Sequence, residues 1–333
     1  MAARTNQKMK LLYIIDILEK YSDEENPINA NELCSRLEAV GVSAERKAIY
    51  NDIDTLIDFG YDIIKTRTPR FGYFLASRRF ELPEVYLLSD AVRSAEFITP
   101  KKTRELISKL DAMLSENQAK KREKGIYING KTKCKNEEIY YNIDKISSAI
   151  EHKKQIKLVY FQRTLQEGKK IVLKEKTLTV SPYALIWEND KYYLVCNNAK
   201  YDNLMHLRLD RIKNVEITAD TYRHFSEVSE YTEFFDIADY TSKTFNMYSG
   251  QTQEIELKCS KKILEQIVDR FSDEIFIYKV TDDTFSFSVK AVVSQGLISW
   301  ILQYGSDIEV ISPETLKDGV IKTVEKIKDM YKC

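Results

Sequence analysis

Aromatic residues and arginines are concentrated between residues 182 and 212, in a pattern that reads as a run of short strands. Successive side chains of a strand point to opposite faces, so alternate positions in each run share a face. Strands are expected at six places: Ile156–Phe161, Lys176–Pro182, Ala184–Trp187, Tyr192–Asn197, Leu204–Leu209 and Val215–Thr218. Short strands separated by frequent turns predict a small β-barrel or sandwich.

The first 60 residues have a helical period instead. Apolar residues at helical spacing predict helices over residues 8–21, 29–40 and about 43–60. Gly41 stands where a helix C-terminal glycine is expected, and Ser43 is expected to cap the N-terminus of the third helix.

Two predicted strands, residues 61–65 and 71–75, follow these helices. The polar, basic segment between them, residues 66–70, is expected to be a turn. Three helices followed by a two-stranded ribbon predict a winged helix-turn-helix.

The middle of the chain is helical again. The pattern runs over residues 82–114 and is broken at Thr99-Pro100. Residues 116–136 are rich in lysine and are expected to form a loop or linker, before an amphipathic helix over 137–152.

The last third reads as two βαβ halves followed by one more helix. Strands are expected at Glu254–Cys259, Ile275–Val280, Phe285–Val293 and Asp307–Ile311, and helices at Lys261–Phe271, Gln295–Tyr304 and Pro313–Tyr331. The order βαββαβ predicts a ferredoxin-like domain.

The third N-terminal helix carries the first group of candidate functional residues. Ile49, Ile53 and Leu56 define its buried stripe, which leaves a polar face near the start of the helix that a major groove could accept. Lys47 suits guanine edges or phosphate, and Asn51 suits adenine edges. The candidates for DNA contact are Ser43, Arg46, Lys47, Tyr50 and Asn51, with Arg67 and Arg70 from the basic turn.

An ordinary solvated face is the alternative interpretation of these residues. Residues 1–77 contain ten Lys/Arg and twelve Asp/Glu, so a DNA-binding domain here must concentrate its positive charge. The turn and the residues after it do so, with Lys65, Arg67, Arg70, Arg78 and Arg79.

The aromatic and basic run supplies a second group of candidates. His206 and Arg208 are expected to share one face of a strand, while Leu207 points into the core. Tyr183 and Tyr193 supply flat rings, and rings beside arginines can stack bases and pair with phosphates. The alternative is that the tyrosines belong to the core and that Asp210 and Arg211 form a structural ion pair.

This run resembles the WYL domain, a small Sm/SH3-like β-barrel sensor of bacterial transcription regulators. Tyr192-Tyr193-Leu194 stands where the family carries Trp-Tyr-Leu, so Tyr192 replaces the family tryptophan. The resemblance implies a polar, basic pocket for nucleic acids or nucleotide-like effectors. Carried over by position, the ligand-binding candidates are Ser181, Tyr183, Tyr193, His206, Arg208 and Arg211.

The third N-terminal helix resembles the recognition helix of DeoR-type regulators. The matching pattern is Ser43-x-x-Arg46-Lys47-x-Ile49-x-x-Asp52-Ile53-x-x-Leu56. The family usually has arginine where this chain has Asn51, which removes one expected DNA contact and bears on affinity or target sequence.

The last third resembles the extension that accompanies WYL domains in such regulators. The expected fold is therefore α+β and multidomain. The expected parts are a winged helix-turn-helix (1–79), a helical connector and linker (80–136), the WYL sensor (137–222), and a linker with the C-terminal extension (223–333).

Composition narrows the functional classes. The chain has 51 basic and 51 acidic residues and no apolar run of membrane-spanning length, and its N-terminus lacks the apolar core of a signal peptide, so a cytoplasmic location is expected. Five cysteines and three histidines are scattered without metal-ligand spacing. Since no nucleophile–base pair or phosphate loop is evident either, we expect neither an enzyme nor a metal or other cofactor.

The sequence thus predicts a ligand-responsive bacterial transcription regulator that binds a double-stranded DNA operator as a homodimer. Its effector is expected to be single-stranded nucleic acid, a nucleotide or another anion. The alternative is a nucleic-acid-binding accessory protein of a phage-defence system, such as a CRISPR-associated one, that acts through the WYL-like region.

Overall fold

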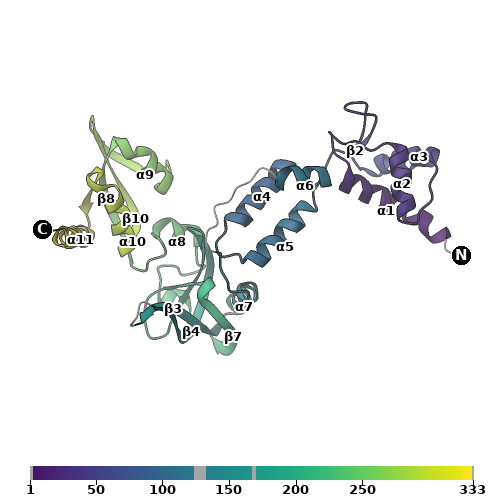
Figure 1. Ribbon diagram of the computed structural model, residues 1–333. Coiled ribbons are helices and arrows are strands. Elements are labelled where there is room, and N and C mark those ends of the chain that lie inside the picture. The colour runs from purple at the N-terminus through teal and green to yellow at the C-terminus, as the bar shows by residue number, and fades with distance from the viewer. Residues whose placement is uncertain (1–2, 124–132, 167–169, 332–333) are drawn as a thin grey trace. The chain divides into compact units, whose positions relative to one another are not determined.

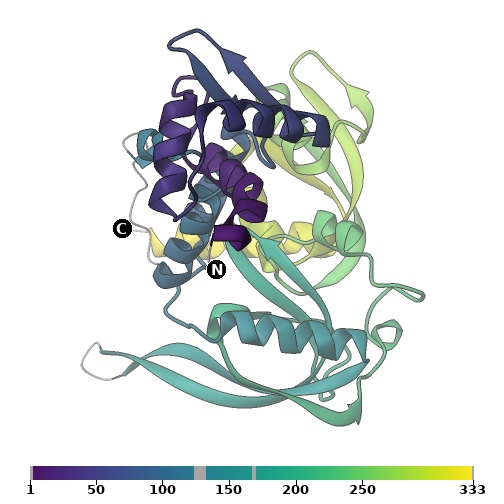
Figure 2. The same cartoon turned by 90° about the vertical axis from the view of Figure 1, so that its right-hand side faces the viewer.

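The computed structural model describes residues 3–123, 133–166 and 170–331, with side chains from residue 9 onward. The chain forms two compact units, Met1–Lys135 and Asn136–Cys333, which Figure 1 and Figure 2 show from two sides. Helices dominate the first unit, and two antiparallel sheets with flanking helices make up the second. The fold is therefore mixed α+β, as expected.

The first unit begins with the three expected helices and the two-stranded ribbon. These elements are α1 (Ala3–Tyr21), α2 (Ala30–Ala39), α3 (Arg46–Phe59), β1 (Ile63–Thr66) and β2 (Gly72–Leu75). Ile14, Leu18 and Leu33 are fully buried between them. Tyr73 of β2 also exchanges backbone hydrogen bonds with Ile28, so that the segment before α2 lies beside the ribbon.

The start of α3 differs from the prediction. Glu45, not Ser43, is the N-terminal capping residue, and its own side chain makes no capping hydrogen bond. The C-terminus fits the prediction, because Gly60 takes the left-handed conformation with φ of 113°. Only the first turn is shifted, so the buried stripe of α3 lies where the periodicity put it.

The helical middle of the chain also differs from the prediction at one place. Helices α4 (Leu82–Ser94) and α5 (Pro100–Asp111) are separated at Thr99, which caps α5. The expected loop over 116–136 is wrong at its start, where α6 (Glu116–Glu123) forms. Its polar residues include good helix formers, so high polarity was a poor reason to expect a loop. Residues 124–132 of that loop lie outside the described residues.

The second unit opens with α7 (Ile139–Glu151), which packs across a five-stranded antiparallel sheet (Figure 2). The strands follow the order β6-β5-β4-β3-β7. Their bounds are β3 (Lys154–Gln166), β4 (Lys170–Glu188), β5 (Lys191–Asn197), β6 (Met205–Arg208) and β7 (Ile212–Thr221). The outer ends of β3 and β4 pair only with each other, as far as the described residues show, and form a long ribbon.

One continuous strand, β4, replaces the two that were expected around Pro182. The pairing with β5 shifts register between Pro182 and Ala184, so the chain passes the proline without leaving the sheet. Asn189 and Asp190 both have positive φ and form the two-residue turn from β4 to β5. This turn fixes Trp187 opposite Tyr192.

The segment after β7 contains a helix that the sequence pattern did not predict, α8 (Ile237–Lys243). It follows a short 3₁₀ turn, Phe225–Glu227. Tyr240 of α8 packs with Ala184 and Val195 against the five-stranded sheet. The segment therefore belongs partly to the core and is more than a connection.

A four-stranded antiparallel sheet completes the second unit, in the order β11-β8-β10-β9. Its strands are β8 (Gln251–Ser260), β9 (Phe276–Val280), β10 (Thr284–Val293) and β11 (Ile308–Ser312). The helices are α9 (Leu264–Phe271), α10 (Gln295–Gln303) and α11 (Glu314–Met330). All the expected strands and helices are present, and Phe287 and Ile267 are fully buried in the core that they share.

Candidate nucleic-acid and effector sites

The N-terminal half of α3 presents its polar residues to solvent. Ile49 and Ile53 face the core, while Arg46, Lys47 and Asn51 are exposed. Ser43 is exposed just before the helix, and Arg67 is exposed in the turn between β1 and β2. These side chains can meet a nucleic acid without unpacking the core.

Tyr50 is less available than its place on the helix suggested. Its ring is half-buried against the core and lies 6.4 Å from the ring of Tyr73. Its hydroxyl accepts a hydrogen bond of 2.7 Å from Nε of Arg46. The pair stiffens the first turn of α3 and sets the direction of Arg46.

Two arginines of the basic region hold the fold together. Arg70 donates from Nε to the carbonyl of Pro27 at 2.9 Å and pairs with Glu32 at 3.2 Å. Arg78 donates to the carbonyls of Glu19 and Ser22, at 2.7 and 2.6 Å, at the C-terminal end of α1. The positive charge of Arg78 therefore satisfies helix carbonyls and is not offered to a ligand.

Tyr183 and Ser181, both on β4, are buried. The Tyr183 hydroxyl donates to the carbonyl of Arg223 at 2.8 Å, and the Ser181 hydroxyl accepts from the Arg223 amide at 2.8 Å. The Tyr183 ring packs with Phe225 and Phe235, and burial raises the pKa of its hydroxyl. Both side chains anchor the segment after β7.

Both ring nitrogens of His206 also make contacts inside the protein. Its Nε2 lies 2.5 Å from the hydroxyl of Tyr240, and its Nδ1 lies 3.2 Å from the hydroxyl of Ser249. Burial lowers the pKa of His206 to about 4, so the ring is neutral at neutral pH. His206 therefore ties β6 to α8 and to the segment that leads into β8.

Arg208 pairs with Asp210 in a two-pronged contact. Its Nε and terminal nitrogen donate to the two carboxylate oxygens at 3.0 and 2.8 Å. The side chains of both residues remain partly exposed, at 25% and 20%. The structural ion pair considered for Arg211 is thus made by Arg208, and a fork–fork geometry of this kind orders the guanidinium.

Lys191, Tyr193 and Arg211 surround this pair. Tyr193 lies directly opposite Arg208 in the sheet register, and the charges of Arg208 and Arg211 act on it. The pKa of Lys191 is lowered, first by burial and then by the charge of Arg208. Lys191, Arg208, Asp210 and Arg211 together carry a net positive charge, and we call them, with Tyr193, the basic cluster. Lys191 was not selected from the sequence, although it adjoins the Tyr-Tyr-Leu run that was.

Other kinds of site find little support in the described part of the chain. Histidine, cysteine and acidic side chains form no group of three there that could hold a metal ion. Cys34, Cys134, Cys196 and Cys259 form no disulfide bond with one another. No helix in the described ranges is both long and apolar enough to cross a membrane.

The chain thus combines a helical first unit with a strand-rich second unit that contains a basic cluster. Comparison with known proteins gives its family. Residues 141–217 match the WYL domain, and residues 251–328 match the WCX domain. The chain belongs to the WYL-domain transcriptional regulators.

Proteins similar to the chain include a curated bacterial regulator and a solved structure. The uncharacterized HTH-type transcriptional regulator YobV of Bacillus subtilis (strain 168) is 21% identical over 295 residues, which cover 86% of this chain and 89% of that protein. A solved structure, proteasome accessory factor B/C (PafBC) of Arthrobacter aurescens, is 13% identical with a TM-score of 0.27. The match takes in 97% of this chain but spans only about half, 49%, of the length of that structure.

Proposed function

We propose that this regulator binds duplex DNA through α3 and the β1–β2 turn and responds to an anionic, nucleic-acid-like effector bound at its WYL domain. It acts in the cytoplasm by binding and not by catalysis. The observation that carries the DNA-binding part is the exposed polar start of α3 opposite a fully buried stripe. The similarity to YobV, an HTH-type transcriptional regulator, supports the same assignment.

We assign fewer residues to direct DNA contact than the sequence alone indicated. Lys47 and Asn51 are free to reach base edges, and Ser43, Arg46 and Arg67 are placed for the backbone. Tyr50 and Arg70 support them from within the protein, through the contacts to Arg46 and Glu32. In this interpretation residues 1–79 form a DeoR-type winged helix and the rest of the first unit is a helical connector.

Replacing Lys47 and Asn51 together by alanine tests this assignment. One good base contact contributes roughly 1–3 kcal/mol, so the double variant should lose at least tenfold in affinity. Duplex fragments selected from genomic DNA by the wild-type protein provide the gel-shift probe. Lys109→Ala, an exposed lysine on α5, is the control for loss of charge. Unchanged specific binding in the double variant would rule out α3 as the recognition helix.

The basic cluster is the effector site that we propose. Its net positive charge favours an anion, and the half-buried ring of Tyr193 can stack on a base. Ser181, Tyr183 and His206 shape the domain around it through their contacts to Arg223 and Tyr240. We interpret the WYL domain as an Sm/SH3-like barrel. We interpret the WCX domain as ferredoxin-like, and the order β11-β8-β10-β9 of its sheet supports this second interpretation.

Titration with short single-stranded oligonucleotides and mononucleotides, followed by calorimetry, tests the effector site. Arg208→Ala with Arg211→Ala should weaken binding at least tenfold, and binding to wild type should weaken as salt rises, because phosphate contacts release counterions. Arg163→Ala, an exposed arginine on β3, is the matched control. Equal binding by the double variant and wild type would place the effector elsewhere. Binding of single strands with no duplex binding at all would favour the defence-system accessory protein.

We also propose a homodimer. Val324, Ile327 and Met330 are exposed along the described part of α11, and a row of apolar side chains of this kind is usually covered in an oligomer. A two-fold dimer places two recognition helices on half-sites about one helical turn, or a multiple of it, apart. Light scattering that gives a monomer both free and on DNA would contradict this.

A further inference from the structure

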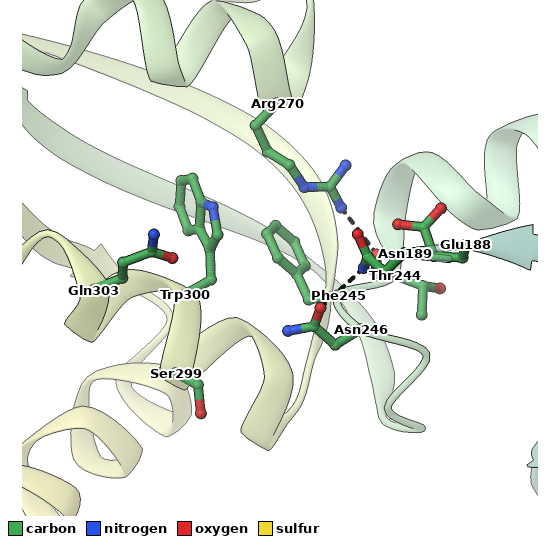
Figure 3. Close-up of a pocket in the computed structure, with 9 residues that line it drawn as sticks. All are labelled: Glu188, Asn189, Thr244, Phe245, Asn246, Arg270, Ser299, Trp300 and Gln303. Carbon is green, nitrogen blue, oxygen red and sulfur yellow. Dashed lines mark hydrogen bonds between the residues drawn. The ribbon is translucent and has the colours of Figure 1, made fainter. Parts of the chain in front are cut away.

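A pocket of about 410 Å³ lies where the WYL domain meets the WCX domain (Figure 3). Its lining comes from three places: Glu188 and Asn189 at the end of β4 and the turn after it, Phe245 and Asn246 in the segment after α8, and Arg270 and Trp300 on α9 and α10. The volume lies within the range of small-molecule sites. None of these residues belongs to the basic cluster or to the DNA-binding face.

Two asparagines close one side of the pocket. Asn189 and Asn246 have φ of 48° and 51°, a left-handed conformation that asparagine tolerates better than most residues. Nδ2 of Asn189 donates to Oδ1 of Asn246 at 3.0 Å, as the dashed line in Figure 3 shows. This bond joins the turn after Glu188 to the segment that leads from α8 into the WCX domain.

Arg270 supplies the positive charge of the pocket. Its guanidinium carbon lies 4.1 Å from the centre of the Phe245 ring, and one terminal nitrogen donates to the carbonyl of Thr244 at 2.9 Å. No carboxylate among the described residues forms an ion pair with it, and burial lowers its pKa. A half-buried guanidinium without a paired anion favours an anionic group that a ligand can provide.

Glu188 supplies the opposite charge. Its carboxylate acts electrostatically on Arg270, although the two side chains do not form an ion pair. Figure 3 shows both charged groups on one side of the pocket and the indole of Trp300 on the other, with Phe245 between. The Phe245 and Trp300 ring centres are 5.3 Å apart, so a flat group can pack against this aromatic wall.

This distribution of charge selects the ligand class. A phosphate dianion would be repelled by Glu188, and an uncharged aromatic compound would leave both charges unpaired. We propose that the pocket binds a small zwitterion of the amino-acid class with a flat side chain. Its carboxylate pairs with Arg270, its ammonium group pairs with Glu188, and its ring packs against Trp300. Because both domains contribute, such a ligand stabilises one arrangement of the WYL and WCX domains.

L-Phenylalanine is the probe, and the full chain is the protein used. The chain has two tryptophans, so Trp187→Phe leaves Trp300 as the only indole and its fluorescence reports on the pocket. We expect saturable binding of L-phenylalanine in calorimetry and a matching fluorescence change. 3-Phenylpropanoate lacks the ammonium group and 2-phenylethylamine lacks the carboxylate, so each should bind about 10- to 100-fold more weakly.

Glu188→Gln separates the proposal from a general anion site. This variant should lose about tenfold in affinity for L-phenylalanine but bind 3-phenylpropanoate as well as wild type does or better. Arg270→Gln should weaken both compounds, and Glu216→Gln, an exposed glutamate on β7, should change neither. If Arg270→Gln fails to fold, Glu188→Gln and the two analogues still decide the outcome.

Three results would overturn the proposal. One is the absence of saturable binding of L-phenylalanine at millimolar concentration. Another is equal affinity of wild type for L-phenylalanine and 3-phenylpropanoate. The third is displacement of L-phenylalanine by uridine monophosphate, which would make the pocket a nucleotide site. None of these results depends on whether the protein binds DNA, so the proposed function is tested separately.

Discussion

Hydrogen-bond partners decide which aromatic and basic side chains of the WYL domain can meet a ligand. Alternation along a strand placed His206 and Arg208 on one face, but it gave no information about what packs over that face. Tyr240, 34 residues later in the chain, covers His206, and Arg223 covers Tyr183 from 40 residues away. Such partners come from segments that the strand pattern does not include, so they could not be predicted from it.

Because His206 is buried, we expect the stability of the folded protein to depend on pH. Its pKa is about 4 in the folded protein and 6.5 in the reference state, so the unfolded chain binds the proton more readily. The stability that the neutral His206 ring gives to the folded protein is therefore complete above pH 6.5 and is lost as the pH falls towards 4. The free energy of unfolding should fall by about 2 kcal/mol at pH 5 and by about 3 kcal/mol below pH 4.

Denaturant unfolding of wild type and His206→Gln at pH 7.5 and pH 5 measures this effect. Other groups also titrate in this range, so the quantity of interest is the difference between the two proteins at each pH. Wild type should lose about 2 kcal/mol more than the variant between the two pH values. His152→Gln, an exposed histidine after α7, is the control and should follow wild type. Parallel losses in wild type and His206→Gln would show that His206 titrates normally.

At the scale of elements, periodicity predicted the type of almost every helix and strand. It failed where the local signal was misleading. Pro182 suggested a break between two strands, but a register shift lets β4 continue past it. The polar composition of 116–123 suggested a loop where α6 forms, and α8 has only seven residues, too few for a clear helical period. Turns and short helices depend on packing partners more than on their own pattern.

The ribbon of the first unit depends on one close backbone approach. Gly72 begins β2, and a methyl group on it would lie 2.8–2.9 Å from the backbone of Ile28. Ile28 exchanges two hydrogen bonds with Tyr73, so the backbone there cannot move away without losing them. Gly72→Ala should therefore reduce the free energy of unfolding of the first unit by about 1–3 kcal/mol.

Chemical denaturation followed by circular dichroism measures this loss. Ser77→Ala, an exposed change just after β2, is the control and should stay within about 0.5 kcal/mol of wild type. Because β2 leads out of the β1–β2 turn, the variant should also weaken DNA binding. If Gly72→Ala is as stable as wild type, Ile28 and β2 are not in the close contact described.

At the scale of the whole molecule, the apolar cores divide along the chain. One buried cluster of the first unit draws its residues from 14–75, and three buried clusters of the second unit lie within 183–316. Within the described residues, each of these buried clusters is complete inside its own unit. A protein built in this way can separate DNA recognition from ligand recognition, because each unit has buried apolar clusters of its own.

Two fragments, residues 1–135 and 136–333, should therefore each fold alone. We expect each to show a cooperative thermal transition and dispersed amide resonances. The second fragment should also keep the effector affinity of the full chain within about twofold, since the basic cluster lies wholly inside it. A cut inside a unit, after Tyr240, is the matched control and should give aggregated or unfolded pieces, because Tyr240 packs against the five-stranded sheet. If the fragment 136–333 is unfolded by itself but folds when 1–135 is added, the cores depend on each other. A signal would then pass from effector to DNA through shared packing and not between two independently stable parts.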